Sequence, residues 1–461
     1  MLPPLHVVAR RRPVALVSPT GAVTVPSGTD LVPLAQPAPY AAVQADLRPT
    51  AGPARVVLRL VSGSTTLSGE LALGSGTAGL SVSDPAGRTS RHRSRRFGRA
   101  TLPVDAVALT LTGTWLTVWT RERGRWTARG RVHLEDRVPT RDEGFVAGLR
   151  AGCVVTGGDA VSAVRAGGFG QVGLRDVRVV SHATGAPVRE DGRLLLTATS
   201  AGPGFFDTGH TSVWALDEGT LALEHRADLF FRRPDRPGVF GDHATHLVRD
   251  AGRWLVATST WGDFRATGPD AGVAVTVAET RADVRHGRHV LDTRLLRLPT
   301  EGLRAVGVWD PHLVRTDDGW LVGYVSARRF FRFHPVLAAG PDLEHLALRS
   351  ADPSRVATEG TTLLRVGGLW RVLASDGPDG RKGQRTRFPV FDLDLREVGT
   401  LRAPYPSNLP WPSLVHTDQG WLMVTFDGRG YGGPLPGYGT HGDVVLLREQ
   451  GAGGDPAAKD G

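Results

Sequence analysis

Three carboxylates occupy similar places in a repeated stretch of this sequence. Asp242, Asp310 and Glu359 each come a few residues before a short apolar run. In a β fold that repeats such runs around an axis, side chains placed just ahead of the runs converge on one pocket. A single carboxylate at the start of a strand would more often cap a turn, but three at matching offsets favour a shared pocket. Carboxyl groups in one pocket can act as acid and base if one is protonated and another ionised near neutral pH.

The apolar runs belong to a phrase that occurs five times in the second half of the chain. Each copy has an apolar pair, a polar turn with glycine and an aromatic-led apolar strand, which is the pattern of a β-hairpin. Periods of 50 to 66 residues, with four short strands per unit, are typical of propeller blades. An array of unrelated hairpins in a large sandwich is the alternative. The copies are matched on Val188, Val248, Val314, Leu364 and Val415.

The first 180 residues lack this phrase but contain alternating strand patterns such as ARVVLRL (54–60) and AVALTLTG (106–113). Their order of strands, charged turns and Gly-x-Trp turns resembles that of the concanavalin-like jelly-roll sandwiches. The segment HATGAP then breaks the strand pattern before the first copy of the phrase. We therefore predict an all-β protein with a jelly-roll β-sandwich over residues 1–183, a five-bladed β-propeller over 184–450 and a disordered tail over 451–461.

The composition fits this architecture and excludes several other classes of protein. The 461 residues suit two or three domains, and 59 glycines with 32 prolines suit many tight turns between strands. The one cysteine, Cys153, lies in an apolar strand pattern and excludes an internal disulfide or a cysteine-based zinc site. The start of the chain lacks the apolar core of a signal peptide, and no apolar run is long enough to span a membrane. We therefore expect a soluble, cytoplasmic protein that does not bind membranes.

The chain is basic, with a formal net charge of +9. Its arginines are scattered, and the densest cluster, RTSRHRSRRFGR at 88–99, is interpreted as a solvated loop rather than as a patch that binds polyanions. We therefore predict no nucleic-acid partner.

Two of the carboxylates lie in motifs that resemble those of glycoside hydrolase family 43, whose members are five-bladed propellers. WDPHLVRTDDGW at 309–320 is similar to the family's segment with an aspartate that tunes the pKa of the general acid. TEGTTLLRVGGLW at 358–370 is similar to the segment that carries the acid itself, with Thr361 in place of the family's proline. The resemblance, over the second half of the chain, implies that Glu359 is the general acid and that Asp310 raises its pKa.

One position departs from the family pattern. The family's catalytic base is an aspartate that opens the first blade, and the register of the repeats places Thr184 in that slot. A base could instead come from Asp242, in the neighbouring blade, or from Asp207, in the loop GPGFFDTGHTS. The resemblance implies an inverting glycosidase for a substrate of the arabinofuranoside or xyloside type. The alternative is a catalytically degenerate propeller that binds carbohydrate without cleaving it.

Loops between the second and third strands of each blade should return to the same end of the propeller as the carboxylates. Aromatic rings there can stack on sugar rings, and polar side chains can bind hydroxyl groups. The candidate contacts are Asp207, His210, His243, Trp261, Arg328, Asp376, Trp411 and His441. No motif for a catalytic metal or an organic cofactor is present, although a structural cation in the propeller channel is compatible with the pattern. The expected partner is a carbohydrate substrate, and the pattern leaves the oligomeric state open.

Overall fold

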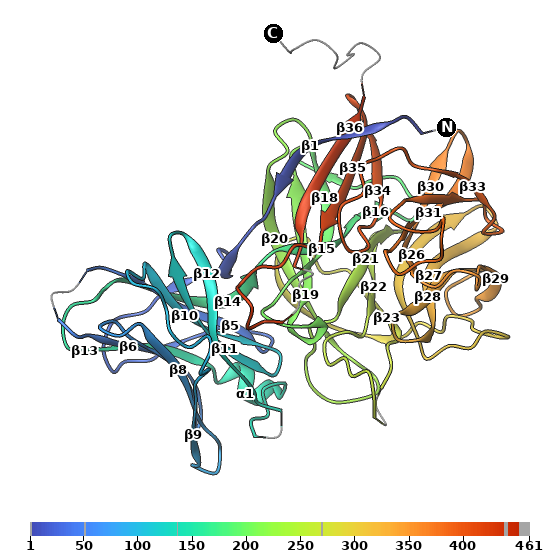
Figure 1. Cartoon of the computed structure of the whole chain (residues 1–461). Coiled ribbons are helices and arrows are strands. Elements are labelled where there is room, and N and C mark those ends of the chain that lie inside the picture. Colours follow the sequence, from blue (N-terminus) through green and yellow to red (C-terminus); the bar gives the residue numbers. More distant parts are fainter. Residues whose placement is uncertain (1, 50–51, 136, 269–270, 438–440, 451–461) are drawn as a thin grey trace, which may run out of the picture.

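The computed structural model describes residues 2–49, 52–135, 137–268, 271–437 and 441–450. Almost all of their regular structure is β-sheet, with one short helix, α1 (Glu143–Ala147), and one 3-10 turn, η1 (Phe206–Thr208). Two packed sheets lie beside a ring of five smaller sheets (Figure 1). This arrangement confirms the predicted all-β fold with a sandwich and a five-bladed propeller. The predicted disordered tail (451–461) lies outside the described residues. No helix in the described ranges is both long and apolar enough to cross a membrane.

The two sheets of the sandwich enclose an aliphatic core. One has the order β12 (Arg125–His133), β11 (Trp115–Glu122), β10 (Ala106–Thr112), β5 (Tyr40–Leu47), β14 (Val161–Gln171) and β2 (Ala15–Val17), with β3 (Val23–Thr24) beside β14. The other has the order β4 (Val32–Pro33), β13 (Arg150–Thr156), β6 (Arg55–Ser62), β7 (Thr65–Ala72), β8 (Thr77–Ser83) and β9 (Thr89–His92). Burial alternates along β6 and β7, so one face of this sheet packs on the other. Cys153 is fully buried in β13, which agrees with the apolar strand pattern around it.

Five smaller sheets form the blades of the propeller. The first has the order β15 (Leu174–Val179), β18 (Arg193–Ser200), β19 (His210–Leu216), β20 (Leu223–Arg232) and β24 (Gly287–Asp292), with β17 (Arg189–Glu190) beside β18. The second has the order β16 (Ser181–His182), β21 (His243–Asp250), β22 (Arg253–Ser259), β23 (Val275–Thr280) and β25 (Arg294–Leu295). The third contains β26 (Gly307–Thr316), β27 (Gly319–Arg329), β28 (Arg332–Gly340) and β29 (Ala347–Ala351). The fourth contains β30 (Thr358–Val366), β31 (Leu369–Asp376), β32 (Pro389–Phe391) and β33 (Glu397–Thr400). The fifth contains β34 (Ser413–Thr417), β35 (Gly420–Asp427), β36 (Asp443–Glu449) and β1 (Leu5–Arg11).

Side chains on the innermost strands β15, β21, β26, β30 and β34 tie neighbouring blades together. His246 on β21 accepts a hydrogen bond from the backbone N–H of Leu313 on β26 at 3.0 Å. Ser413 of β34 donates to the backbone carbonyl of Val177 on β15 at 2.7 Å, which joins the fifth blade to the first. The ring is therefore closed by contacts close to its axis.

The strand pairing places the boundary between the sandwich and the propeller differently from the prediction. Residues 174–182, expected in the sandwich, form β15 and β16 and belong to the first two blades. Residues 5–11, also expected in the sandwich, form β1 and pair antiparallel with β36, so this strand completes the last blade. The predicted boundary at 183/184 is corrected accordingly: the sandwich is inserted between β1 and β15.

The first copy of the repeated phrase is shifted by one strand. In the other four blades the first run of the phrase forms the long strand at the inner edge of the sheet, with the two-residue strand β16 beside it in the second blade. In the first blade that place belongs to β15. Val188 follows β15 and donates its backbone N–H to the carbonyl of Val180 at 2.8 Å. Val180, and not Val188, is therefore the residue that corresponds to Val314.

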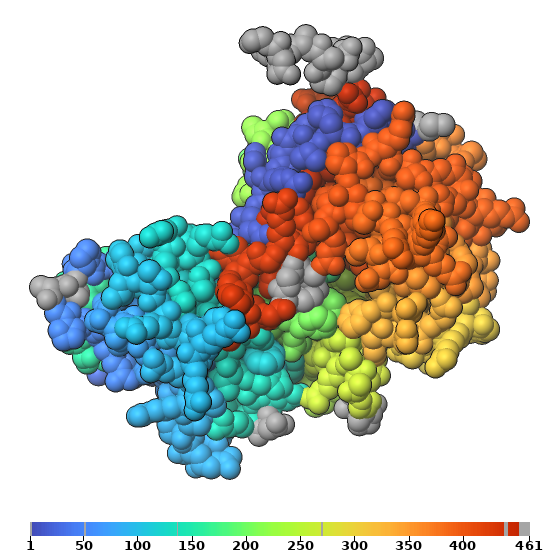
Figure 2. All heavy atoms as spheres, in the orientation of Figure 1, coloured from blue at the N-terminus to red at the C-terminus, as the bar shows by residue number. Residues whose placement is uncertain are grey.

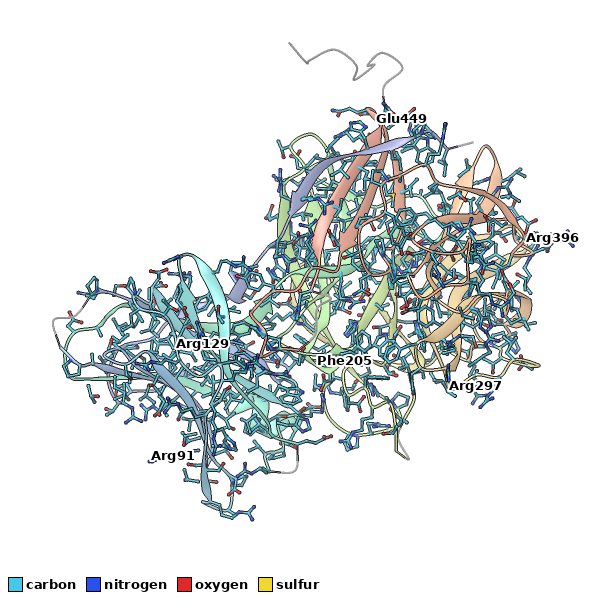
Figure 3. All side chains as sticks on the ribbon, in the orientation of Figure 1. Arg91, Arg129, Phe205, Arg297, Arg396 and Glu449 are labelled. Atoms are coloured by element: carbon cyan, nitrogen blue, oxygen red, sulfur yellow. The ribbon has the colours of Figure 1, made fainter. Side chains whose placement is uncertain are left out.

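The sandwich and the propeller share an apolar interface. Trp119 from the sandwich belongs to the same buried cluster as Phe230 from the propeller. The loop before β36 crosses to the sandwich, where the carbonyl of Gly432 accepts a hydrogen bond from the N–H of Ala128 at 2.9 Å. Figure 2 shows this orange-red segment lying against the cyan sandwich. The arginine-rich hairpin, marked by exposed Arg91, projects away from the rest of the sandwich (Figure 3).

Candidate active site

The innermost strands of the first four blades carry the same irregularity near their start. Strand pairing slips between residues 175 and 178, 243 and 246, 309 and 312, and 359 and 362. At these bulges Asp176, Ala244, Asp310 and Gly360 have φ between 52° and 70°, a left-handed conformation that is uncommon outside glycine. A bulge re-aims the side chains around it, and such features gather next to active sites.

A pocket of about 300 Å³ lies beside these bulges, and three carboxylates line it. They are Asp176 from β15, Asp310 from β26 and Glu359 from β30. Asp176 and Asp310 are almost fully buried, whereas Glu359 is partly exposed to the pocket. The remaining lining residues are Arg175, Phe205, Phe206, His243, Ala244, Trp261, Trp309, Phe330, Phe331, Phe333, Asn408, Leu409 and Trp411.

Asp176 is held by two hydrogen-bond donors at the wall of the pocket. Its Oδ1 accepts from Nε of Arg175 at 3.2 Å, and its Oδ2 accepts from Oγ1 of Thr199 at 2.7 Å. A guanidinium and a hydroxyl are donors that pair well with an ionised carboxylate. Nδ1 of His243 lies 3.9 Å from Oδ2 of Asp176, so the imidazole and the carboxylate border the same point of the pocket.

His243 presents a neutral hydrogen-bond acceptor to Asp176. The N–H at Nε2 donates to the backbone carbonyl of Phe206 at 3.0 Å, which places the ring proton on Nε2 and leaves Nδ1 bare. Burial lowers the pKa of His243 to about 4, so the ring is neutral near pH 7. Among the described residues, Nδ1 has no hydrogen-bond partner. Nδ1 of His243 and Oδ2 of Asp176 are therefore two buried acceptors that one donor molecule can satisfy.

Asp310 and Glu359 form a coupled pair of acids. Burial, and then the negative charge of Glu359, hold the pKa of Asp310 well above its usual range. Burial raises the pKa of Glu359 to about 7, while Arg175 opposes this rise and the charge of Asp176 adds to it. Burial, rather than the charge of Asp310 that the sequence predicts, is thus the main reason for the raised pKa of Glu359. The pair retains a proton near neutral pH.

A buried arginine lies where the first, third and fourth blades meet. Arg178 of β15 donates to the backbone carbonyls of Asp310 and Thr361, both at 3.0 Å. Its guanidinium lies 4.4 Å from the ring centre of Trp411. Burial lowers the pKa of Arg178 only to about 10, so it keeps its positive charge near neutral pH. Arg178 therefore fixes the backbone of two of the strands that carry the carboxylates.

The sequence pattern is compatible with a structural cation in the propeller channel, but the side chains beside Arg178 are not suited to bind one. His246 and His312 stack with ring centres 4.0 Å apart, and Nδ1 of each accepts a backbone N–H, so those lone pairs are already in use. A cation there would also be repelled by Arg178. Within the described ranges, no group of three or more His, Cys, Asp or Glu side chains could hold a metal ion.

The structure brings part of the predicted site together and supplies a carboxylate that the prediction lacks. The predicted residues that line the pocket are Glu359, Asp310, His243, Trp261 and Trp411. Asp176 is the additional carboxylate, and Thr184, which the sequence places in its slot, lines a different pocket that shares no residue with this one. A signal for Asp176 is present in the sequence, because it precedes Val180 by four residues, as Asp310 precedes Val314.

Asp242 lies outside the pocket, contrary to the prediction that it supplies the base. Its Oδ2 accepts from Nε of Arg233 at 2.8 Å, and its Oδ1 accepts from the backbone N–H of Gly262 at 3.0 Å. The side chain is fully buried in this ion pair. The bulge position of the second blade is Ala244, so this blade contributes no carboxylate to the pocket.

Asp242→Asn is therefore expected to impair stability rather than catalysis. Breaking a buried ion pair leaves Arg233 with Asp263 as its remaining counter-charge and should cost about 3 kcal/mol of the free energy of unfolding. Asp235→Asn is the matched control, because the Asp235–Arg236 pair is partly exposed and should contribute less than about 1 kcal/mol. Urea denaturation and kcat of the folded variants measure the two effects. A stable Asp242→Asn protein without activity would restore Asp242 as a candidate base.

The other predicted contacts make structural interactions outside the pocket. The indole N–H of Trp115, in the sandwich, donates to Asp207 at 2.7 Å. His210 is buried against Asp228, with Nε2 and Oδ1 3.1 Å apart. The remaining predicted contacts bond to neighbouring protein groups and do not line the pocket: Arg328, Asp376 and His441.

No protein-family model and no curated protein sequence matches the chain. Solved structures with a similar fold include a thermostable family-43 glycoside hydrolase, which is 14% identical over 62% of this chain and 95% of that chain, with a TM-score of 0.39. A family 117 glycoside hydrolase from the marine bacterium Zobellia galactanivorans is 11% identical over 60% and 84%, with a TM-score of 0.43. An α-L-arabinanase from Cellvibrio cellulosa, complexed with arabinohexaose, is 13% identical over 60% and 92%, with a TM-score of 0.36. At these values the likeness assigns no function to the chain.

Proposed function

We propose that the protein is a glycoside hydrolase in which Glu359 is the general acid and Asp176 is the general base. The observation that carries the proposal is the meeting of carboxylates from three blades in one pocket, in different environments. Asp176 accepts hydrogen bonds from a guanidinium and a hydroxyl, as suits an ionised base. The raised pKa values of Asp310 and Glu359 keep a proton on that pair. Cleavage of a glycosidic bond uses such a protonated carboxyl group together with an ionised one.

Glu359, rather than Asp310, is assigned as the acid because it is the member of the pair that is partly exposed to the pocket. Asp310 is almost fully buried, and its Oδ2 has no hydrogen-bond partner among the described residues. We propose two roles for Asp310. It raises the affinity of the pair for a proton, and its Oδ2 accepts a hydrogen bond from a hydroxyl group of the substrate. The pair then delivers the proton to the leaving oxygen through Glu359.

The surroundings of Asp176 support water as the attacking group. Its Oδ2 and Nδ1 of His243 are 3.9 Å apart, and both are acceptors, so one water molecule can donate to both. The proton of this water passes to Asp176 as its oxygen bonds to the anomeric carbon. On the opposite face the bond to the leaving oxygen breaks, and Glu359 supplies the proton that this oxygen needs. The proposed reaction is hydrolysis with inversion.

The proposed substrates are glycosides of the arabinofuranoside or xyloside type. The pocket volume of about 300 Å³ suits a bound sugar ring, and the indoles of Trp261 and Trp411 form part of its wall. The motifs around Asp310 and Glu359 support this substrate type. None of the proposed steps requires a cofactor.

Hydrolysis of 4-nitrophenyl glycosides tests the proposal, with α-L-arabinofuranosides and β-D-xylosides first. We expect the wild type to release nitrophenol and the double variant Asp176→Asn, Glu359→Gln to release none. Proton NMR of the first product should show inversion of the anomeric configuration. Retention would contradict Asp176 as a base. Binding of sugars without cleavage of any glycoside would contradict hydrolysis and favour a propeller that only binds carbohydrate.

A further inference from the structure

The mouth of the pocket is built largely from phenylalanines. Phe205 and Phe206 come from the loop between β18 and β19, and Phe330 and Phe331 come from the turn between β27 and β28. Phe205 and Phe331 are 38% and 54% exposed, although both are large apolar side chains. Phe205 lies near the junction of the sandwich and the propeller (Figure 3). The pocket thus opens to solvent between apolar rings from two different blades.

These rings continue as a wall from the mouth toward the carboxylates. The ring centres of Phe205 and Phe206 are 4.2 Å apart, and Phe205 faces Phe331 at 6.4 Å. Phe206 contacts Trp261 at 4.4 Å, and Trp261 contacts Trp309 at 5.2 Å. Trp309 directly precedes one of the three carboxylates, so the aromatic wall reaches the proposed reaction centre.

Few of the side chains that line the pocket away from the bulges are polar. Apart from the three carboxylates, Arg175 and His243 at the bulges, and the indoles, Asn408 is the only polar side chain among the described lining residues. A phenylalanine neither donates nor accepts a conventional hydrogen bond. A sugar ring placed between Phe205 and Phe331 would give up hydrogen bonds to water without replacing them, which disfavours its binding.

We infer that the leaving group of the substrate is apolar, an aromatic or aliphatic alcohol rather than a second sugar. The inference rests on the proposed function, because it takes Glu359 as the group that protonates the leaving oxygen. Glu359 is the carboxyl group that is partly exposed, so the leaving group lies on the mouth side of the glycosidic bond and the sugar lies on the buried side. An apolar leaving group there buries its surface against Phe205 and Phe331.

Alkyl glycosides of one sugar test this inference, because their leaving oxygens have similar basicity while their apolar surface grows. For the sugar that the nitrophenyl screen identifies, we expect kcat/KM to rise about threefold per methylene group from the methyl to the hexyl glycoside. Phe331→Ala should lower the hexyl-to-methyl ratio about tenfold. Leu369→Ala is the matched control, since Leu369 is 57% exposed but lies outside the pocket, and it should leave the ratio unchanged. A wild-type ratio near one, or faster cleavage of a disaccharide of the same sugar, would overturn the inference.

Binding without turnover separates this inference from the proposed function. Tryptophan fluorescence of the Glu359→Gln variant, titrated with methyl and hexyl α-L-arabinofuranoside, reports the Kd of each, with Trp261, Trp309 and Trp411 in the pocket as probes. Tighter binding of the hexyl glycoside, lost when Phe331→Ala is added, would support the apolar mouth even if the wild type hydrolyses nothing. Equal affinity for the two glycosides would overturn the inference even if hydrolysis is established.

Discussion

Asp176→Asn is expected to lower kcat about 10³-fold on every glycoside that the wild type hydrolyses. Asparagine has nearly the same size and can still accept the hydrogen bond from Thr199, but it cannot take a proton from water. The loss should not depend on the leaving group, because the base acts on the water and not on the leaving oxygen. Steady-state kinetics with 4-nitrophenyl and 2,4-dinitrophenyl glycosides measure both points.

Chemical rescue provides an independent readout for the same variant. Azide needs no base to attack, so it should partly restore turnover of Asp176→Asn and yield a glycosyl azide of inverted configuration. Asp207→Asn is the control, since Asp207 is bonded to Trp115 outside the pocket and should retain activity near that of the wild type. Full activity of a stably folded Asp176→Asn protein would place the base elsewhere.

Two of the three carboxylates are predictable from the sequence, because each lies at the start of an innermost strand with an unmistakable hairpin after it. Asp310 precedes Val314 by four residues, and Glu359 precedes Leu364 by five. The bulges on β26 and β30 hold Asp310 and the residue after Glu359 in left-handed conformations. The repeated spacing in the sequence thus reflects a repeated backbone geometry, and this geometry brings the two side chains together.

The third carboxylate escapes prediction because the first blade contains a longer connection. Residues 180–186, which include β16, separate β15 from the copy of the phrase that begins at Pro187. The short strand β17 then pairs with β18, where the innermost strand is expected. Matching the copies on Val188 therefore takes the wrong strand, after β15, as the innermost one. As a result, Asp176 is assigned to the sandwich. Matching on the pair Asp176 and Val180 restores the spacing of the third blade.

Other parts of the site depend on three-dimensional detail that spacing does not carry. Asp242 lies two residues before the bulge position of its strand, and there an arginine nine positions earlier in the chain neutralises it. The phenylalanine mouth joins loops about 125 residues apart, whose approach depends on the angle between blades. The orientation of the Asp242 side chain toward Arg233 has no periodic signal in the sequence. The contact between Phe205 and Phe331 has none either.

Glu359→Gln should show a different pattern from the base variant, with a loss that depends on the leaving group. Turnover of an alkyl glycoside, whose leaving oxygen must be protonated, should fall about 10³-fold, whereas a 2,4-dinitrophenyl glycoside should lose less than about tenfold. Glutamine keeps the shape of the side chain and has no proton to give. Glu279→Gln is the matched control, because Glu279 is a partly exposed partner of Arg253 outside the pocket.

The pH profile distinguishes loss of the acid from a general disturbance of the site. The pKa of Glu359 is raised to about 7, so kcat/KM of the wild type for an alkyl glycoside should be highest below that pH and fall tenfold per unit above it, as the carboxyl group loses its proton. For the dinitrophenyl glycoside the fall above pH 7 should disappear in Glu359→Gln, because no titrating acid is left. The limb belongs to the coupled pair of Asp310 and Glu359, so Asp310→Asn should change its position, because only one of the two titrating carboxyl groups then remains. Equal losses of Glu359→Gln on both leaving groups, with the alkaline limb unchanged, would mean that Glu359 is not the proton donor.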